Sequence, residues 1–214
     1  MFNCKIYLLH FMDTRTRIIE ESAALFMKQG IKGITMNEIA QSMGISKRTL
    51  YEHFSNKEDL LTACMNFWHQ DSCRMYEAIK NATPNPLEVI YQHFKQAVIM
   101  LGQVHPNLVS DIRKYHPAIW QKQLQAFEEE RLQFTTEFLD QGKEQGLFRK
   151  DVNNEIATRL LYAQIDHLHD SDLFPHHRFA KTDIYREILF LFLHGICTTK
   201  GLQEMERIFE TPNY

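Results

Sequence analysis

Apolar residues recur along this chain with the spacing of amphipathic helices. Within residues 14–29, Ile18, Ala23 and Phe26 are spaced for helix packing, and Gly30 follows at the position where a left-handed residue commonly ends a helix. The pattern predicts a first helix that buries these side chains.

Two short helices are predicted next, joined by a tight turn. Residues 35–38, Thr-Met-Asn-Glu, match the capping box, in which the threonine oxygen accepts from the third helical N–H and the glutamate bonds back to the cap. This helix can run only as far as Gly44, and Ser46 offers an N-cap for a second helix carrying Leu50 and Phe54 on one face. Two short helices around a glycine-containing turn are typical of a helix-turn-helix.

The rest of the chain also has helical spacing. A long helix is expected from Lys57 to about Lys80, and residues 81–86 end it because they contain two prolines within three positions. Further helices are expected to begin near Leu87, at Pro106 and Pro117 as first-turn prolines, and at Asn153 and Thr182 as caps. With only 8 Gly and 6 Pro in 214 residues, we predict an all-α fold of about nine helices.

Charge is distributed unevenly along the chain, although the formal net charge is only -3. Residues 13–60 hold seven Lys or Arg and seven Asp or Glu, whereas residues 61–214 hold sixteen and twenty. The stretch 46–57, inside the predicted helix-turn-helix, has three basic residues and one acidic residue. This balance argues against a protein that coats nucleic acid indiscriminately, and leaves a short basic stretch as a candidate contact.

The cysteines and the N-terminal residues argue against a disulfide-rich, metal-binding or membrane-spanning protein. The 4 cysteines include no C-x-x-C pair and no zinc-finger spacing to histidine, so we expect neither a disulfide framework nor a metal site. Residues 1–11 hold an apolar stretch of about half the length of a membrane-spanning helix, without a cleavage site. We expect residues 1–12 to be a disordered arm, or an extension upstream of a true start at Met12. We also expect the protein to be cytoplasmic and to have no cofactor.

The best-defined motif lies in residues 35–61, which read T-M-N-E-I-A-Q-S-M-G-I-S-K-R-T-L-Y-E-H-F-S-N-K-E-D-L-L. They closely resemble the N-terminal DNA-binding module of the TetR family, and the resemblance covers about 48 residues from Asp13 to Leu60. It implies a three-helix DNA-binding domain at 13–60 and a helical ligand-binding and dimerisation domain at 61–214. The function it implies is a transcriptional repressor that a small-molecule inducer releases from a palindromic operator.

Eight polar residues of this motif are candidate DNA contacts. Because the first turns of a recognition helix reach the base edges, Lys47 and Arg48 are expected to read bases, and Arg suits guanine O6 and N7. The others suit phosphate oxygens, and the resemblance implies a backbone clamp by Thr35, Tyr51 and Lys57. The full set is Thr35, Ser46, Lys47, Arg48, Thr49, Tyr51, His53 and Lys57.

Several of these residues also have a plain structural explanation. Thr35 and Ser46 are helix caps first, although a cap hydroxyl can serve both purposes. Tyr51 and His53 could merely pack beside Phe54. The acidic Glu52 is unexpected on a DNA-facing helix, and lies either on the rim or against cytosine N4.

The last long helix indicates a partner subunit. Residues 184–196 are apolar on every side, and such a helix must be buried all round. The core of one monomer could bury it, but the chain has few other helices to surround it, which favours a partner subunit. Residues 145–153, Q-G-L-F-R-K-D-V-N, resemble more weakly the connection between the seventh and eighth helices of the TetR family. By that analogy the final two long helices form a four-helix bundle in a homodimer, whose paired recognition helices would meet half-sites roughly 34 Å apart.

The effector site is less well defined by the sequence. Aromatic bulk with a few polar tips suits a small-molecule cavity, although each of these residues could equally be plain core. The histidines and aspartates of residues 166–177 have no compact metal-site spacing, so an exposed loop is expected there. The candidate ligand-binding residues are Phe94, Trp120, Phe127, Tyr162 and His167.

Two other classes of function compete with a DNA-binding regulator. The chain has no glycine-rich phosphate loop, no G-x-S-x-G turn and no cysteine with an activating partner, so an enzyme is not expected. A helical lipid-binding or protein-binding module that has lost operator binding is the alternative, which Glu52 and the acidic second part of the chain support slightly.

Overall fold

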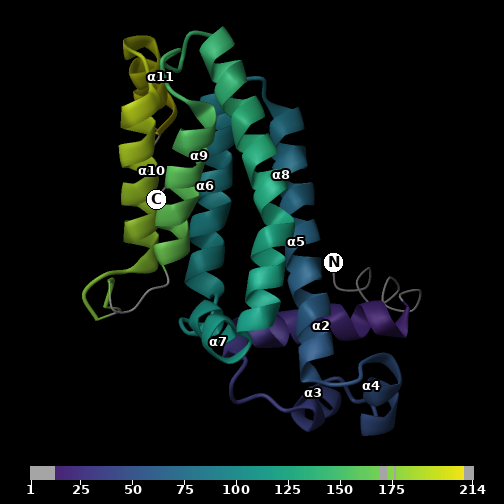
Figure 1. The fold of residues 1–214 in the computed structure, drawn as a ribbon. Helices are drawn as coiled ribbons and strands as arrows, with labels where there is room; N and C mark the ends of the chain where they lie inside the picture. Colours follow the sequence, from purple (N-terminus) through teal and green to yellow (C-terminus); the bar gives the residue numbers. More distant parts are fainter. Residues whose placement is uncertain (1–12, 169–172, 176, 210–214) are drawn as a thin grey trace, which may run out of the picture. The chain divides into compact units, whose positions relative to one another are not determined.

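The computed structural model describes residues 13–168, 173–175 and 177–209, so the predicted arm at residues 1–12 lies outside it. The described part confirms the all-α fold, with ten helices rather than about nine and a single isolated bridge between Phe148 and Cys197. The helices are α2 (Thr14–Gln29), α3 (Met36–Ser42), α4 (Lys47–His53), α5 (Lys57–Ala82), α6 (Pro86–Gln103), α7 (Leu108–Tyr115), α8 (Pro117–Glu144), α9 (Asn154–His167), α10 (Lys181–Ile196) and α11 (Thr199–Phe209) (Figure 1).

The chain divides into two compact units. The first contains the described residues up to Cys73 together with Val104–Gln123, and the second contains Arg74–Gln103 and the described residues from Leu124 onward. Helices α5 and α8 contribute to both units, so a boundary at one sequence position cannot describe the division. The functional domains 13–60 and 61–214 stay predictions.

The first unit is built around the core shared by α2, α3, α4 and the start of α5. Phe26, Ile39 and Leu50 are fully buried in this core, where their apolar surface is removed from water. Leu108 and Ile112 of α7 belong to the same cluster, although they lie some fifty residues further along the chain. The core of this unit is therefore completed by a segment outside the recognised motif.

The second unit is a bundle in which α6 contacts both α10 and α11, and α10 also contacts α9 (Figure 1). Its loop after α8 is fixed by backbone bonds, since the Arg149 N–H donates to the Ile196 carbonyl at 2.8 Å and the Thr198 N–H donates to the Leu147 carbonyl at 2.9 Å. Gly146 has a φ of 70°, which explains why α8 ends there. No helix in the described part has the length and hydrophobicity that a membrane-spanning helix needs.

Four details of the sequence prediction were wrong. Pro106 lies before the Asn107 cap of α7 rather than in its first turn. Helix α10 begins after Ala180, so Thr182 lies inside it and does not cap it. Helix α11 was not predicted at all. Helix α10 is not apolar on every side, because it also exposes charged side chains such as Arg186 and Glu187.

Candidate nucleic-acid interface

Helices α3 and α4 contact each other and form the predicted helix-turn-helix (Figure 1). The capping box of α3 is complete, because the Glu38 N–H donates to Thr35 Oγ1 at 3.3 Å and the Thr35 N–H donates to Glu38 Oε2 at 2.7 Å. These bonds to Thr35 lower the pKa of Glu38, so this carboxylate stays ionised. Ser46 caps α4 as predicted, accepting from the Thr49 N–H at 3.0 Å.

Two arginines of α2 hold the turn and α4 in place. Arg17 donates through Nη2 to the carbonyl of Met43 at 2.9 Å, and its Nε donates to Glu21 at 2.8 Å. The guanidinium of Arg15 lies over the Phe54 ring, 5.0 Å from its centroid. The sequence prediction missed both arginines, and the only signal for Arg17 was the four-residue spacing to Glu21.

The outer face of α4 presents three of the predicted contacts to solvent. Lys47 and Arg48 lie in its first turn, and Tyr51 follows one turn later with 52% of its surface exposed. Leu50, between them in sequence, is fully buried and anchors the helix. The helix therefore has one face bound to the core and one free face that carries two cations and a phenol.

The remaining polar residues of the motif are partly engaged within the protein. The Thr35 hydroxyl donates to Glu38 Oε2 at 2.8 Å, and the hydroxyls of Ser46 and Thr49 lie 2.9 Å apart. A phosphate contact by the Thr35 hydroxyl requires an exchange of partners, whereas the bond between Ser46 and Thr49 uses only one of their two hydroxyl hydrogens. His53 is half-buried at the end of α4. For all of them a DNA contact stays a prediction.

Lys57 lies at the start of α5 with its ammonium turned toward the protein. Its Nζ donates to the Ile31 carbonyl, which uses one of its three hydrogens. Partial burial lowers the pKa of Lys57, while the carboxylates of Glu38 and Asp111 act in the opposite direction. The side chain is half-buried, so its other two hydrogens can still serve an anion at this helix start.

The acidic residue that looked misplaced on α4 has a defined partner. Arg48 donates from Nε to Glu52 Oε1 at 3.0 Å, and the two side chains are 89% and 57% exposed. The two predicted places for Glu52, the rim of the DNA contact and cytosine N4, both stay predictions. Sequence spacing alone could have suggested this pair, because the residues are four apart on one helix.

Residues 104–116 attach to the first unit through specific polar contacts. The His105 N–H donates to the Met27 carbonyl at 2.6 Å, and the His105 ring covers Gly30, whose φ is 78°. At the end of α7, His116 Nδ1 lies 3.3 Å from the Glu58 carboxylate. This segment follows α6, and the sequence motif gave no sign that it joins the first unit.

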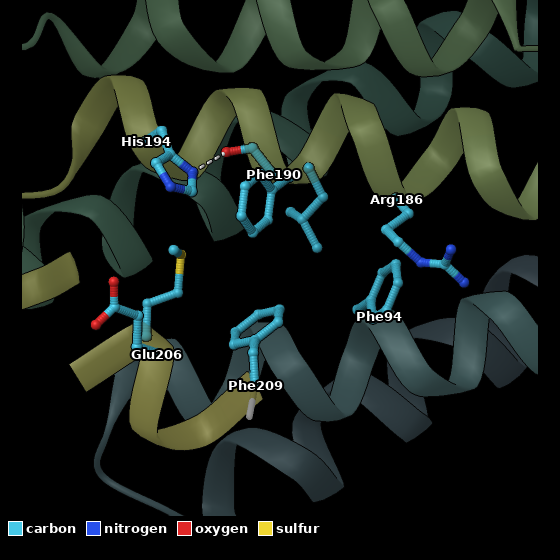
Figure 2. A pocket seen from close by; sticks show the side chains of 8 residues that line it. Phe94, Arg186, Phe190, His194, Glu206 and Phe209 are labelled. Carbon is cyan, nitrogen blue, oxygen red and sulfur yellow. Dashed lines mark hydrogen bonds between the residues drawn. The ribbon is translucent and has the colours of Figure 1, made fainter. Parts of the chain in front are cut away.

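A cavity of about 370 Å³ opens between α6, α10 and α11 in the second unit (Figure 2). Figure 2 shows Arg186 at one end and Glu206 with His194 at the other, with phenylalanine rings between them. The His194 Nδ1 donates to the Phe190 carbonyl at 2.8 Å, which fixes the ring. The lining residues are Phe94, Arg186, Leu189, Phe190, His194, Met205, Glu206 and Phe209.

Of the five predicted ligand-binding residues, only Phe94 lines this cavity. Trp120 belongs to the first unit, where the Arg113 guanidinium lies 4.8 Å from its ring centroid. His167 is exposed and bonds to the Ala163 carbonyl at 2.8 Å. The side chain of Phe127 lies outside the described residues, as do His169, Asp170 and His176 of the predicted polar loop.

Tyr162, the fifth predicted residue, belongs to a separate polar cluster in the second unit. Its hydroxyl lies 3.3 Å from that of Thr135, and the Arg131 guanidinium lies 5.0 Å from its ring centroid. Two tyrosines near it are removed from water, and this burial raises the pKa of Tyr76 and of Tyr185 to about 12. As ligand contacts, Phe94, Trp120, Phe127, Tyr162 and His167 stay predictions.

Comparison with known proteins identifies the first unit's motif. Residues 18–64 match the profile of the family described as "Bacterial regulatory proteins, tetR family". The HTH-type transcriptional regulator YvaF of Bacillus subtilis, itself uncharacterized, is 28% identical over 185 residues, which is 84% of this chain and 94% of YvaF. The HTH-type transcriptional repressor KstR2 of Mycobacterium tuberculosis is 26% identical over 165 residues, covering 69% of this chain and 75% of KstR2.

Solved structures extend the likeness beyond the motif. A transcriptional regulator from Cytophaga hutchinsonii superposes with a TM-score of 0.69 over 86% of this chain and 98% of its own, at 20% sequence identity. At this identity the superposition establishes the fold alone. It shows that the helices after residue 64 follow the arrangement of a known transcriptional regulator.

Proposed function

The chain belongs to the TetR family of bacterial DNA-binding transcriptional regulators, and from this premise we propose that it is a repressor that acts as a homodimer on a palindromic operator. A small-molecule inducer bound by the second unit releases it. The observation that carries the proposal is the free face of α4, where Lys47, Arg48 and Tyr51 are exposed while Leu50 is buried. These groups supply base-reading and phosphate-binding donors at the outer surface of one helix.

The homodimer is supported by apolar side chains that α9 and α10 leave uncovered. Ile156 and Leu160 lie one turn apart on α9 and are each 58% exposed, and Leu191 on the neighbouring α10 is 67% exposed. Exposed apolar residues on two adjacent helices suit a four-helix bundle with the same two helices of a second copy. Pairing removes this surface from water and places two α4 helices on one operator.

The inducer site is supported by the cavity between α6, α10 and α11. Its volume of about 370 Å³ lies within the range of small-molecule sites, and its walls combine aromatic rings with a few polar groups. An effector shifts the protein from the operator only if it binds the released state more tightly than the DNA-bound state. Differential affinity of this kind is the property to measure for any candidate inducer.

Selection of duplexes from a random library, followed by titration at several salt concentrations, tests operator binding. We expect an enriched palindrome, and a logarithm of the binding constant that falls linearly with the logarithm of salt concentration. Arg48→Ala is the matched variant, since it removes an exposed side chain without touching the core. The absence of any enriched duplex would favour the alternative, a helical module that has lost operator binding.

A further inference from the structure

The ion pair between Arg48 and Glu52 lies on the face of α4 that the operator is expected to meet. Arg48 Nε donates to Glu52 Oε1 at 3.0 Å, and both side chains are largely exposed. In the described part of the chain, neither side chain has another hydrogen bond or ion pair. Among the residues that the structure describes, this pair is thus the one hydrogen-bonded restraint on the arginine that is best placed to read a base.

Helix stability does not account for this pair. Exposed pairs of this kind contribute little because water and salt screen them. The order is also the weaker one, since an acidic residue placed before a basic residue complements the helix dipole better than the reverse. A carboxylate on this face is moreover repelled by phosphates, so its presence has a cost for DNA binding.

The geometry of the bond points to a role in positioning. The bond occupies Nε and leaves the two outer hydrogens of the guanidinium, one on Nη1 and one on Nη2, without a hydrogen-bond partner among the described residues. Guanine O6 and N7 accept two parallel N–H bonds from such a fork. Arginine has many rotamers, and a side chain held in one orientation before binding loses less entropy on the operator.

We propose that Glu52 is a positioning residue that holds the Arg48 guanidinium in the orientation that reads guanine at one position of each half-site. This inference rests on operator binding through α4. It assigns Glu52 to specificity rather than affinity, because the carboxylate orients one base contact while it weakens attraction to every phosphate. It also excludes a direct contact from Glu52 to a cytosine as the main role of this residue.

The test uses the full-length protein, its selected operator, and a panel of duplexes with each base pair replaced in turn. Dissociation constants are measured for the wild type, Arg48→Ala, Glu52→Ala, Glu52→Gln and the double variant R48A/E52A. Glu58→Ala is the charge-matched control, since it removes an exposed carboxylate of the same unit that does not touch Arg48. Thermal unfolding of each variant establishes that it is folded.

We expect Glu52→Ala to reduce discrimination at the base pair read by Arg48 by roughly 3- to 10-fold. Glu52→Gln retains an acceptor oxygen and should reduce it less. In the Arg48→Ala background the Glu52 substitution should change discrimination no further, because its effect passes through Arg48. Glu58→Ala should alter affinity for all duplexes equally and leave discrimination intact.

Three outcomes would overturn the inference. Tighter binding of Glu52→Ala to every duplex with unchanged discrimination would reduce Glu52 to a repulsive charge. Lost discrimination at a different base pair from that of Arg48 would make Glu52 a direct reader. A wild-type protein that binds no duplex would overturn the proposed function together with this inference, whereas the first two outcomes leave operator binding in place.

Discussion

Individual side chains around α4 differ in how far they are committed within the unbound protein. Arg48 and Tyr51 project into solvent, whereas the Lys57 ammonium already donates to the Ile31 carbonyl and the Thr35 hydroxyl to Glu38. A phosphate contact by the Thr35 hydroxyl has to replace its bond to Glu38, so its net gain is smaller, whereas Lys57 keeps two ammonium hydrogens for an anion. Polar residues that look alike in the sequence motif are therefore expected to contribute different amounts to the free energy of DNA binding.

Tyr51 and Lys57 are expected to contact phosphates and so to affect all sequences alike. Tyr51→Phe should weaken binding by about 5- to 10-fold, the equivalent of one hydrogen bond worth about 1–1.5 kcal/mol. Lys57→Ala should also lower the slope of log affinity against log salt by about one, since one released counterion is lost. Titration of both variants against the operator panel checks this. A loss confined to one base pair would contradict a phosphate role.

His93 of α6 should make the second unit sensitive to acid. Burial lowers the pKa of His93 below its ordinary value of 6.5, so in the window beneath 6.5 the unfolded chain binds more protons than the folded one. Stability should thus be complete above about pH 6.5 and fall as the pH is lowered through this window. Urea unfolding of the wild type and His93→Gln from pH 5 to 8 at one protein concentration measures it. An equal fall in the variant would assign the effect to other groups.

At the scale of elements, helix ends with a local chemical signal could be predicted from the sequence. The caps at Thr35, Ser46 and Asn153 and the end at Gly30 were all predicted correctly, because each signal involves residues within one turn. The start of α10 could not be predicted from the sequence, since Ala180 provides no side-chain cap. Helix α11 was missed although it has such a signal, because the Gly201 N–H donates to Thr198 Oγ1 at 3.1 Å and Thr198 thereby caps its start.

Contacts between segments that are far apart in the chain could not be predicted from the sequence either. Arg17 binding to the Met43 carbonyl, and α7 completing the first unit's core, depend on residues that only folding brings together. The exposed polar face of α4 was predictable because it lies on one short helix. The cavity was not predictable, because residues of three helices form it. Of its lining residues, only Phe94 was predicted from the sequence.

The junction of α11 with the loop after α8 requires a glycine. A Cβ at Gly201 would lie 2.0 Å from the Leu147 carbonyl oxygen, whereas a Cβ at Gly102 in α6 meets nothing within 4 Å. We expect Gly201→Ala to destabilise the protein by about 1–3 kcal/mol or more, since a backbone atom must move. Gly102→Ala should be neutral or stabilise by up to about 1 kcal/mol through helix propensity. Urea unfolding of the pair checks this, and equal midpoints would show that the junction adapts freely.

At the scale of the whole molecule, the proposed regulator depends on two copies of the chain. Each copy has one α4, and a palindromic operator has two half-sites, so binding of the second head becomes intramolecular once the first is bound. Affinity for the full operator is then far higher than for a half-site. The exposed Leu160 and Leu191 would control this gain, although they lie far along the chain from the predicted DNA contacts.

Leu191→Arg should therefore separate dimerisation from DNA recognition. A cation replaces an apolar side chain that is 67% exposed in the single chain, so the fold is retained while burial against a partner becomes unfavourable. Sedimentation equilibrium should give a dimer for the wild type and a monomer for the variant. Ile99→Arg, the same kind of change at a 50% exposed site on α6, is the control and should remain dimeric.

The same variants distinguish a dimer that binds both half-sites of the operator from a dimer that plays no part in DNA binding. Leu191→Arg should lose roughly 100-fold or more in affinity for the two-site operator, because the effective concentration of the second head is lost. Its affinity for a duplex containing a single half-site should match that of the wild type, since α4 is unchanged. Equal losses on both duplexes would mean that the substitution damages the DNA-binding unit, and a dimeric Leu191→Arg would place the interface elsewhere.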